Sequence, residues 1–118
     1  MIVCAIDDLL FSIKIWTAAK QLGVNVYFER FRDRLLPTIR DKQPSLVIFD
    51  LNSSRLDPMT AIASMKTDPQ LRTVKTLGYV AHVDSDAIAT ARQAGIDQVL
   101  ARSAFTAQLG TILENGRD

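Results

Sequence analysis

The sequence has few of the residues that mark redox, metal and disulfide-rich proteins. Among its 118 residues are one cysteine, Cys4, and one histidine, His82. A single cysteine cannot form an internal disulfide, and a zinc or iron centre built from cysteine and histidine clusters is excluded. Cys4 lies inside an apolar run, so we expect a small core residue there. We expect His82 to be a surface loop residue rather than part of a phosphorelay or metal site.

Membrane segments and strong net charge are also missing. No apolar run approaches the roughly 18 residues that a membrane-spanning helix needs, and no signal peptide is recognisable at the N-terminus. Fourteen basic and thirteen acidic residues leave a net charge of +1, which gives no electrostatic reason to bind nucleic acid or an anionic membrane. No Gly-rich phosphate-binding loop is present. We therefore expect a cytoplasmic protein that binds neither nucleic acid nor membranes.

Short apolar runs alternate with amphipathic segments along the chain. The length fits one domain, residues 1–118, with a core that needs no metal or disulfide. We expect strands at 2–6, 24–28, 46–50, 76–81 and 98–101, and helices at 9–22, 34–42, 57–67, 85–94 and 104–115. Asp57 is expected to cap the helix that Pro58 begins, and Ser85-Asp86 the helix after it.

This alternation predicts a three-layer α/β fold, a five-stranded parallel sheet with five helices on its two faces. By analogy, five strands of this size fit the flavodoxin-like order 2-1-3-4-5. Ligands of such sheets bind outside the carboxyl ends of the strands, where the order reverses.

Two predicted strands end in carboxylates at that edge. Asp7 and Asp8 follow the first strand, and Asp50 ends the third. Three carboxylates in one cleft repel one another unless a cation lies among them, and Mg²⁺ prefers such oxygen ligands. The alternative is that these are ordinary polar residues and that Asp8 only caps the following helix.

These residues make the chain resemble the receiver domain of two-component response regulators along essentially its whole length. The resemblance rests on Asp7-Asp8, on Asp50 after the run 46–49, and on Ala94-Gly95-Ile96-Asp97 before the fifth strand.

The resemblance implies a role for each residue of the acidic cluster. Asp50 would accept a phosphoryl group from a histidine kinase, Asp8 would bind Mg²⁺ directly, and Asp7 would act largely through water. The backbone carbonyl of Asn52 would complete the metal ligands. Such a domain is a signalling switch and not an enzyme.

Several positions depart from the family pattern. Val80 stands where the family has the Ser or Thr that hydrogen-bonds the phosphoryl group. Arg102 replaces a Lys to which it is not equivalent, and Val99 replaces an aromatic switch residue. The Met-Pro often found after the acceptor is here Asn52-Ser53.

These departures leave several hypotheses open. The domain could take phosphate but signal it differently, or it could be a pseudo-receiver in which Arg102 pairs with Asp50 and fills the phosphoryl space. A small phosphatase with Asp50 as nucleophile, and an interaction module without metal, are weaker alternatives.

The helix at 9–22 carries more apolar surface than one sheet face requires. Leu9, Ile13 and Trp16 form a second stripe beside its core stripe. We interpret this stripe as a contact with a histidine kinase, another signalling protein or a second copy of the chain. The alternative is that the stripe packs against the last helix.

Overall fold

The computed structural model describes residues 1–81 and 84–117, so His82 lies outside the described residues. Its five strands form one parallel sheet in the order β2-β1-β3-β4-β5, as predicted. The strands are β1 (Ile2–Ala5), β2 (Val26–Glu29), β3 (Leu46–Asp50), β4 (Lys75–Val80) and β5 (Gln98–Ala101). The helices are α1 (Leu9–Leu22), α2 (Arg32–Lys42), α3 (Pro58–Thr67), α4 (Ser85–Ala94), α5 (Arg102–Ala107) and α6 (Leu109–Asn115).

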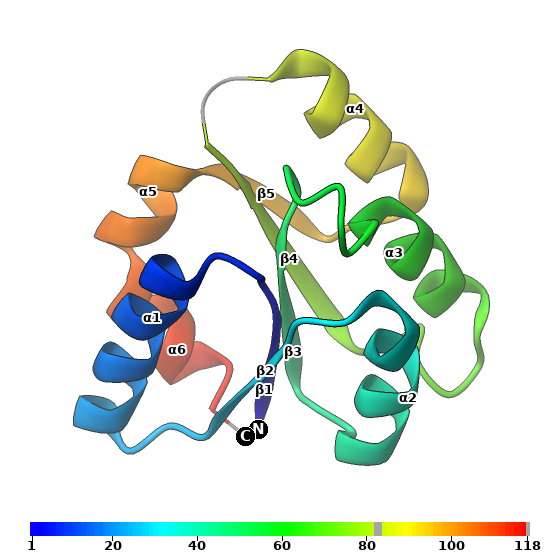
Figure 1. Ribbon diagram of the computed structural model, residues 1–118. Coiled ribbons are helices and arrows are strands. Elements are labelled where there is room, and N and C mark those ends of the chain that lie inside the picture. The colour runs from blue at the N-terminus through cyan, green and yellow to red at the C-terminus, as the bar shows by residue number, and fades with distance from the viewer. Residues whose placement is uncertain (82–83, 118) are drawn as a thin grey trace.

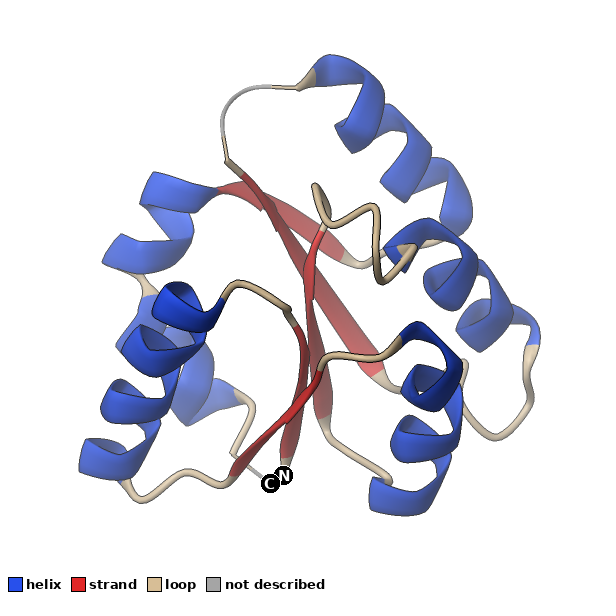
Figure 2. Cartoon of the chain, viewed as in Figure 1, coloured by secondary structure: helices blue, strands red, loops and turns tan. Residues whose placement is uncertain are grey.

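Helices cover both faces of the sheet, which confirms the three-layer flavodoxin-like architecture. Helices α1, α5 and α6 lie on one face, and α2, α3 and α4 on the other (Figure 1). The sheet is the middle layer (Figure 2). Alternate strand residues enter the two cores because side chains of a strand point to opposite faces. In β3, Val47 and Phe49 pack beneath α2–α4, whereas Leu46 and Ile48 pack beneath α1 and α6.

The last helix is broken, so the chain has six helices among its described residues where we predicted five. The break lies at Gln108, whose φ of −104° and ψ of 9° depart from helical values. Its N–H group is shared between the carbonyl oxygens of Ala104 and Phe105, at 3.0 and 3.2 Å. Gly110, which lowers helix propensity, follows shortly afterwards.

Two predicted helix caps were wrong. Asp57 adopts a left-handed φ of 48° and makes no side-chain cap bond; its carboxylate instead accepts the hydroxyl of Thr60 at 2.7 Å. Pro58 already supplies a helical φ and no N–H, so α3 starts without that cap. Helix α4 is capped by Asp84, one residue earlier than predicted, whose carboxylate accepts the N–H of Ala87 at 3.1 Å.

Other boundaries moved by one or two residues, which is the usual uncertainty of segment ends. Strand β2 starts at Val26 and not at residue 24, and α2 starts at Arg32 and not at residue 34. Cys4 is fully buried, as predicted, and burial raises the pKa of its thiol. In the described part of the chain, no helix combines the length and apolarity that crossing a bilayer requires.

Gly78 in β4 is required by close packing. A Cβ atom at this position would lie 2.7 Å from Leu51 Cδ1 and 2.8 Å from Ile96 Cδ1. Leu51 follows Asp50 directly, so a side chain at residue 78 would press on the loop that leaves the acidic edge.

Gly78→Ala is expected to lower the free energy of unfolding by about 1–3 kcal/mol, because the added methyl group overpacks the core. Gly110→Ala is the matched control. A Cβ atom there meets nothing within 4 Å, and replacing a helical glycine should stabilise the protein by about 0.5–1 kcal/mol. Chemical denaturation of both variants measures this. Equal effects in the two variants would contradict the packing argument.

Candidate functional site

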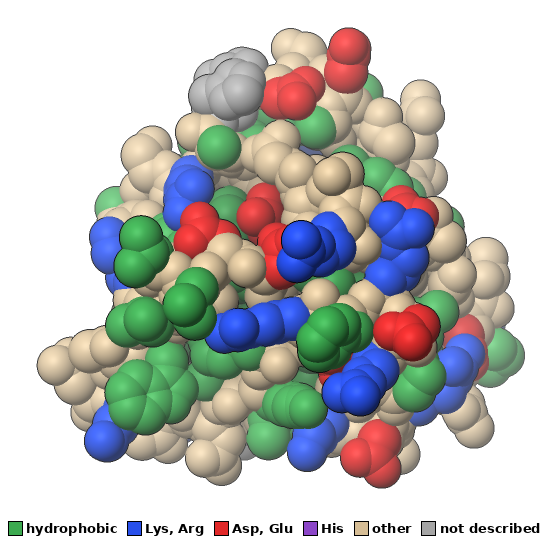
Figure 3. Space-filling view, viewed as in Figure 1, with side chains coloured by type: hydrophobic (Ala, Val, Ile, Leu, Met, Phe, Trp, Pro, Cys, Tyr) green, Lys and Arg blue, Asp and Glu red, His purple; other side chains and the backbone are tan. Residues whose placement is uncertain are grey.

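The sheet register brings the acidic residues to one edge. Strand β1 pairs with β3 so that Ala5 lies opposite Phe49. Asp50 therefore ends β3 where the chain leaving β1 carries Asp7 and Asp8. Burial raises the pKa of Asp50, and the nearby charge of Asp7 adds to this rise. Figure 3 shows acidic side chains gathered near the middle of the face drawn, with basic side chains on either side.

Asp8 caps helix α1 and also forms an ion pair. Its Oδ1 accepts the N–H of Phe11 at 3.1 Å, and its Oδ2 accepts Nη2 of Arg102 at 3.1 Å. The Phe11 N–H and, to a lesser degree, the Arg102 guanidinium lower the pKa of the Asp8 carboxyl. The interpretation of Asp8 as a helix cap is thus confirmed, and the carboxylate has a second partner besides.

Arg102, the first residue of α5, lies over an aromatic surface. Its Cζ is 4.1 Å from the ring centroid of Phe11 and 5.9 Å from that of Tyr79. We had suggested that Arg102 pairs with Asp50, and this is wrong: its ion pair is with Asp8. The physical reason is that the Phe11 ring supports the guanidinium within reach of Asp8, because Phe11 lies on the first turn of α1, which Asp8 caps.

The Asp50 carboxylate is held by one backbone donor, and no cation of the described residues pairs with it. Its Oδ1 accepts the N–H of Asn52 at 3.0 Å. The side-chain oxygen of Asn52 in turn accepts the N–H of Ala81 at 2.7 Å, which ties the loop after β3 to the end of β4. No basic side chain of residues 1–81 and 84–117 forms an ion pair with Asp50. Val80 is 1% exposed and packs into the core beneath α2–α4, so it offers Asp50 no donor.

Asp7 has a distant basic neighbour. Nε of Arg55 lies 3.9 Å from Oδ2 of Asp7, and the Arg55 side chain is 78% exposed. An exposed pair at this distance contributes little. The negative charge at this edge is therefore compensated mainly at Asp8.

The donor set fits a hard divalent cation. Asp7, Asp8 and Asp50 supply carboxylate oxygens of the kind that Mg²⁺ prefers, and no basic side chain of residues 1–81 and 84–117 is paired with Asp50. As the side chains stand, however, no three acidic, histidine or cysteine residues of the described chain are grouped closely enough to hold a metal ion. One of the required oxygens, Asp8 Oδ2, is engaged by Arg102.

An aromatic cluster beneath the site was not anticipated from the sequence. The ring centroid of Tyr79 lies 4.9 Å from the ring centroid of Phe11 and 4.9 Å from that of Phe105. The Tyr79 hydroxyl is buried without a hydrogen-bond partner in the described part of the chain, and burial raises its pKa. Because Tyr79 pairs in register with Asp50, strand alternation could have placed it beside the acidic residue.

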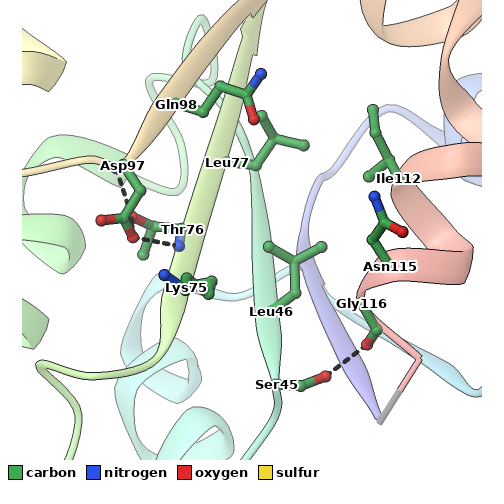
Figure 4. A pocket seen from close by; sticks show the side chains of 10 residues that line it. All are labelled: Ser45, Leu46, Lys75, Thr76, Leu77, Asp97, Gln98, Ile112, Asn115 and Gly116. Atoms are coloured by element: carbon green, nitrogen blue, oxygen red, sulfur yellow. Dashed lines mark hydrogen bonds between the residues drawn. The ribbon is translucent and has the colours of Figure 1, made fainter.

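A cavity of about 400 Å³ lies at the opposite ends of the strands (Figure 4). Leu46, Leu77 and Ile112 line it, and Ser45 donates a hydrogen bond to the Gly116 carbonyl at its rim. Asp97 on its wall accepts the N–H and the hydroxyl of Thr76, at 2.8 and 2.9 Å. This cavity shares no residue with the acidic edge.

Asp50→Asn is expected to raise the free energy of unfolding at neutral pH. Since the pKa of Asp50 is raised in the folded state, folding favours the protonated form, and the wild type loses stability as the pH rises above the ordinary value of 3.8. Asparagine removes that cost. The gain should shrink as the pH falls below this value, where the carboxyl group is protonated in both states.

Denaturant unfolding of wild type and variant across this pH range measures the effect. Asp41→Asn, at an exposed position of α2, is the control and should change stability little at any pH. A variant less stable than wild type at neutral pH would show that the folded state compensates the charge of Asp50.

Solved structures similar to this chain are receiver domains and response regulators. A response regulator from Hahella chejuensis is 12% identical with a TM-score of 0.85, over 96% of this chain and 91% of that chain. A signal receiver domain from Bermanella marisrubri is 18% identical with a TM-score of 0.83, over 99% and 97%. The receiver domain of a Pseudomonas aeruginosa sensor histidine kinase, solved with a magnesium ion in its active site cleft, is 19% identical with a TM-score of 0.83, over 98% and 94%.

No protein-family model matches the sequence, and neither does any curated protein. The structural similarity covers nearly the whole chain at high TM-scores and low identity, so it establishes the fold. The predicted resemblance is confirmed at this level: the chain has the fold of response-regulator receiver domains.

Proposed function

We propose that this protein is a receiver domain of two-component signalling in which Asp50 accepts a phosphoryl group. The observation that carries the proposal is the convergence of Asp7 and Asp8 with Asp50 at the edge of β1 and β3. The fold supports it, because the similar solved structures are receivers and response regulators. We further propose that the protein signals through protein contacts and does not act as an enzyme.

The surroundings of Asp50 support its proposed role as phosphoacceptor. Its carboxylate is partly desolvated and carries no ion pair within the described chain. A nearby positive charge, or a covalent bond to one of its oxygens, would therefore reduce the free-energy cost of the buried negative charge. One oxygen would form a bond to phosphorus while the bond from phosphorus to the donor breaks. The hydrogen bond from the Asn52 N–H to Oδ1 holds the carboxylate in place.

The cofactor Mg²⁺ would be held by the carboxylates of Asp7, Asp8 and Asp50 and by the Asn52 carbonyl. When bound, it would offset negative charge on phosphoryl oxygens. The magnesium-bound receiver domain from Pseudomonas aeruginosa supports this assignment. Val80 supplies no hydroxyl, and Arg102 stands where the family has Lys. The side chains that would contact a phosphoryl group on Asp50 therefore differ from the family pattern.

The pseudo-receiver remains the second candidate, and one observation favours it. Arg102 already neutralises Asp8, so the acidic edge is partly compensated without metal or phosphate. In that case the fold would present a fixed surface to its partner.

The test is exposure to a small-molecule phosphodonor with Mg²⁺, followed by intact-mass measurement. We expect a mass gain of one phosphoryl group in the wild type and none in Asp50→Asn. Asp57→Asn, which alters a carboxylate in the loop after the same strand, should behave as wild type. A wild type that gains no mass, with or without Mg²⁺, would favour the pseudo-receiver. Turnover of a phosphate ester would favour the phosphatase.

We propose that the face of α1 formed by Leu9, Ile13 and Trp16 contacts a signalling partner. These side chains are 54%, 50% and 50% exposed, so they are not buried against the last helix as the alternative required. They border a groove of about 200 Å³ that Phe28 and Arg30 complete. Hydrophobic side chains lie beside basic ones on the face drawn in Figure 3.

The charges on this face indicate the chemistry of its partner. Arg30 lines the groove, and Lys20 lies 4.9 Å from the centre of the Trp16 ring. A surface that combines apolar and acidic side chains would complement these residues. A second copy of the same face would instead bring basic groups toward one another, so we propose a different protein, such as a histidine kinase, as the occupant.

Trp16 is the only tryptophan, so its fluorescence reports on this face. An amphipathic Leu/Glu peptide helix is expected to shift Trp16 emission to shorter wavelength, with an affinity that falls as salt rises. The matched Leu/Lys peptide should have no effect, and Ile13→Glu should weaken the response. If the shift instead follows protein concentration alone, with a dimer in sedimentation, the occupant is a second copy.

A further inference from the structure

We propose that Arg102 is an internal counter-ion that a divalent cation must displace from Asp8, so that metal binding releases the start of helix α5. The inference rests on the proposed function, because it takes the acidic edge as the metal site. It adds a role for the residue that departs most clearly from the family pattern. Asp8, Phe11 and Arg102 are called the Asp8 clamp below.

The Asp8 clamp engages both oxygens of the carboxylate. Oδ1 accepts the Phe11 N–H and Oδ2 accepts Arg102 Nη2, both at 3.1 Å. Phe11 contributes twice, because its ring also lies 4.1 Å beneath the guanidinium carbon of Arg102. A guanidinium that is stacked and hydrogen-bonded at once is held more firmly than an extended surface arginine.

Arg102 and a metal ion cannot share Asp8 Oδ2 without cost. Both are cations, and at adjacent positions on one carboxylate they repel each other. Mg²⁺ also needs its ligands in near-octahedral geometry with several waters, which a guanidinium on the same oxygen obstructs. The two occupants therefore compete, and the affinity for the metal is reduced by the free energy of the clamp.

The clamp couples the acidic edge to the rest of the molecule. Arg102 is the first residue of α5 and directly follows β5. Its guanidinium also lies over Tyr79, at 5.9 Å from the ring centre. Displacement of Arg102 from Asp8 would change the cover of this aromatic cluster and the first turn of α5. Arg102 would thus transmit metal binding at the acidic edge to α5 and the aromatic cluster. Val80 and Val99 cannot do so, because they lack the hydroxyl and the aromatic ring that the family has at these positions.

The test is the affinity for Mn²⁺, measured by electron paramagnetic resonance of the free ion. Arg102→Gln removes the charge and leaves a shorter polar side chain, and we expect it to bind Mn²⁺ about tenfold more tightly than wild type, as loss of one charged hydrogen bond implies. Phe11→Leu removes the ring but keeps an apolar side chain and the N–H that Asp8 accepts, so it should give a smaller gain. Arg55→Ala is the matched control, because it removes a positive charge near Asp7 that does not touch Asp8.

A second measurement follows the clamp in the wild type. Saturating Mg²⁺ should change the near-ultraviolet circular dichroism of the Tyr79 cluster, and should change it less in Arg102→Gln, where the guanidinium is already gone. Far-ultraviolet spectra and thermal unfolding confirm that each variant is folded.

The outcomes separate this proposal from the proposed function. Equal Mn²⁺ affinity in wild type and Arg102→Gln overturns the clamp but leaves the metal site. An equal gain in Arg55→Ala and Arg102→Gln also overturns it, because general charge would then explain the effect. Absence of Mn²⁺ binding in every variant overturns both proposals.

Discussion

The pairing of β1 with β3 is the constraint on which the acidic edge depends. Side-by-side parallel strands in this register end at the same level, so the residues that follow Ala5 and Phe49 meet at one edge. A shift of one residue would reverse the faces of every side chain in a strand. Because β1 and β3 are buried almost completely and their alternate residues fill two different cores, that shift would mispack both cores, and the register that places Asp50 is therefore fixed by packing.

The charges at this edge are balanced unevenly. Asp8 has a close cation and an N–H donor, whereas Asp50 has a backbone donor and a pKa raised by burial. In such a site the charge of Asp8 is already neutralised by Arg102, whereas the carboxylate of Asp50 has no cation partner in the described chain. We propose that the carboxylate of Asp50 receives the phosphoryl group and that the pair of Asp8 with Arg102 sets the affinity for the metal ion.

The fold was predictable because its determinants are local patterns. Apolar runs bounded by turn residues placed the five strands, and the alternation with helices led to the parallel sheet, whereas the strand order rested on analogy with flavodoxin-like folds. The break at Gln108 was not predictable, because Phe105, Leu109 and Leu113 keep helical spacing across it. The cap at Asp84 was missed because Ser85-Asp86 offers an equally good pattern one residue later.

The site was predictable only in part, for a related reason. Its acidic residues lie at the ends of predicted strands, and the ends of neighbouring parallel strands meet at the same edge of the sheet. The partner of Arg102 depends on a contact across 94 residues of chain, and the choice of Asp8 over Asp50 is made by the ring of Phe11, which the sequence presents simply as a core residue of α1. Strand alternation could have placed Tyr79 beside Asp50, but its ring contacts with Phe11 and Phe105 arise only in the fold.

The most direct test of this account is the side-chain nitrogen resonances of Arg102, followed by NMR during titration with Mg²⁺. Without metal, the guanidinium should show the slow rotation of a paired and stacked group. The account predicts that it gains rotational freedom in step with the shifts of Asp8 and Asp50. An Arg102 guanidinium that stays hindered at saturating Mg²⁺, while both aspartates shift, would contradict it.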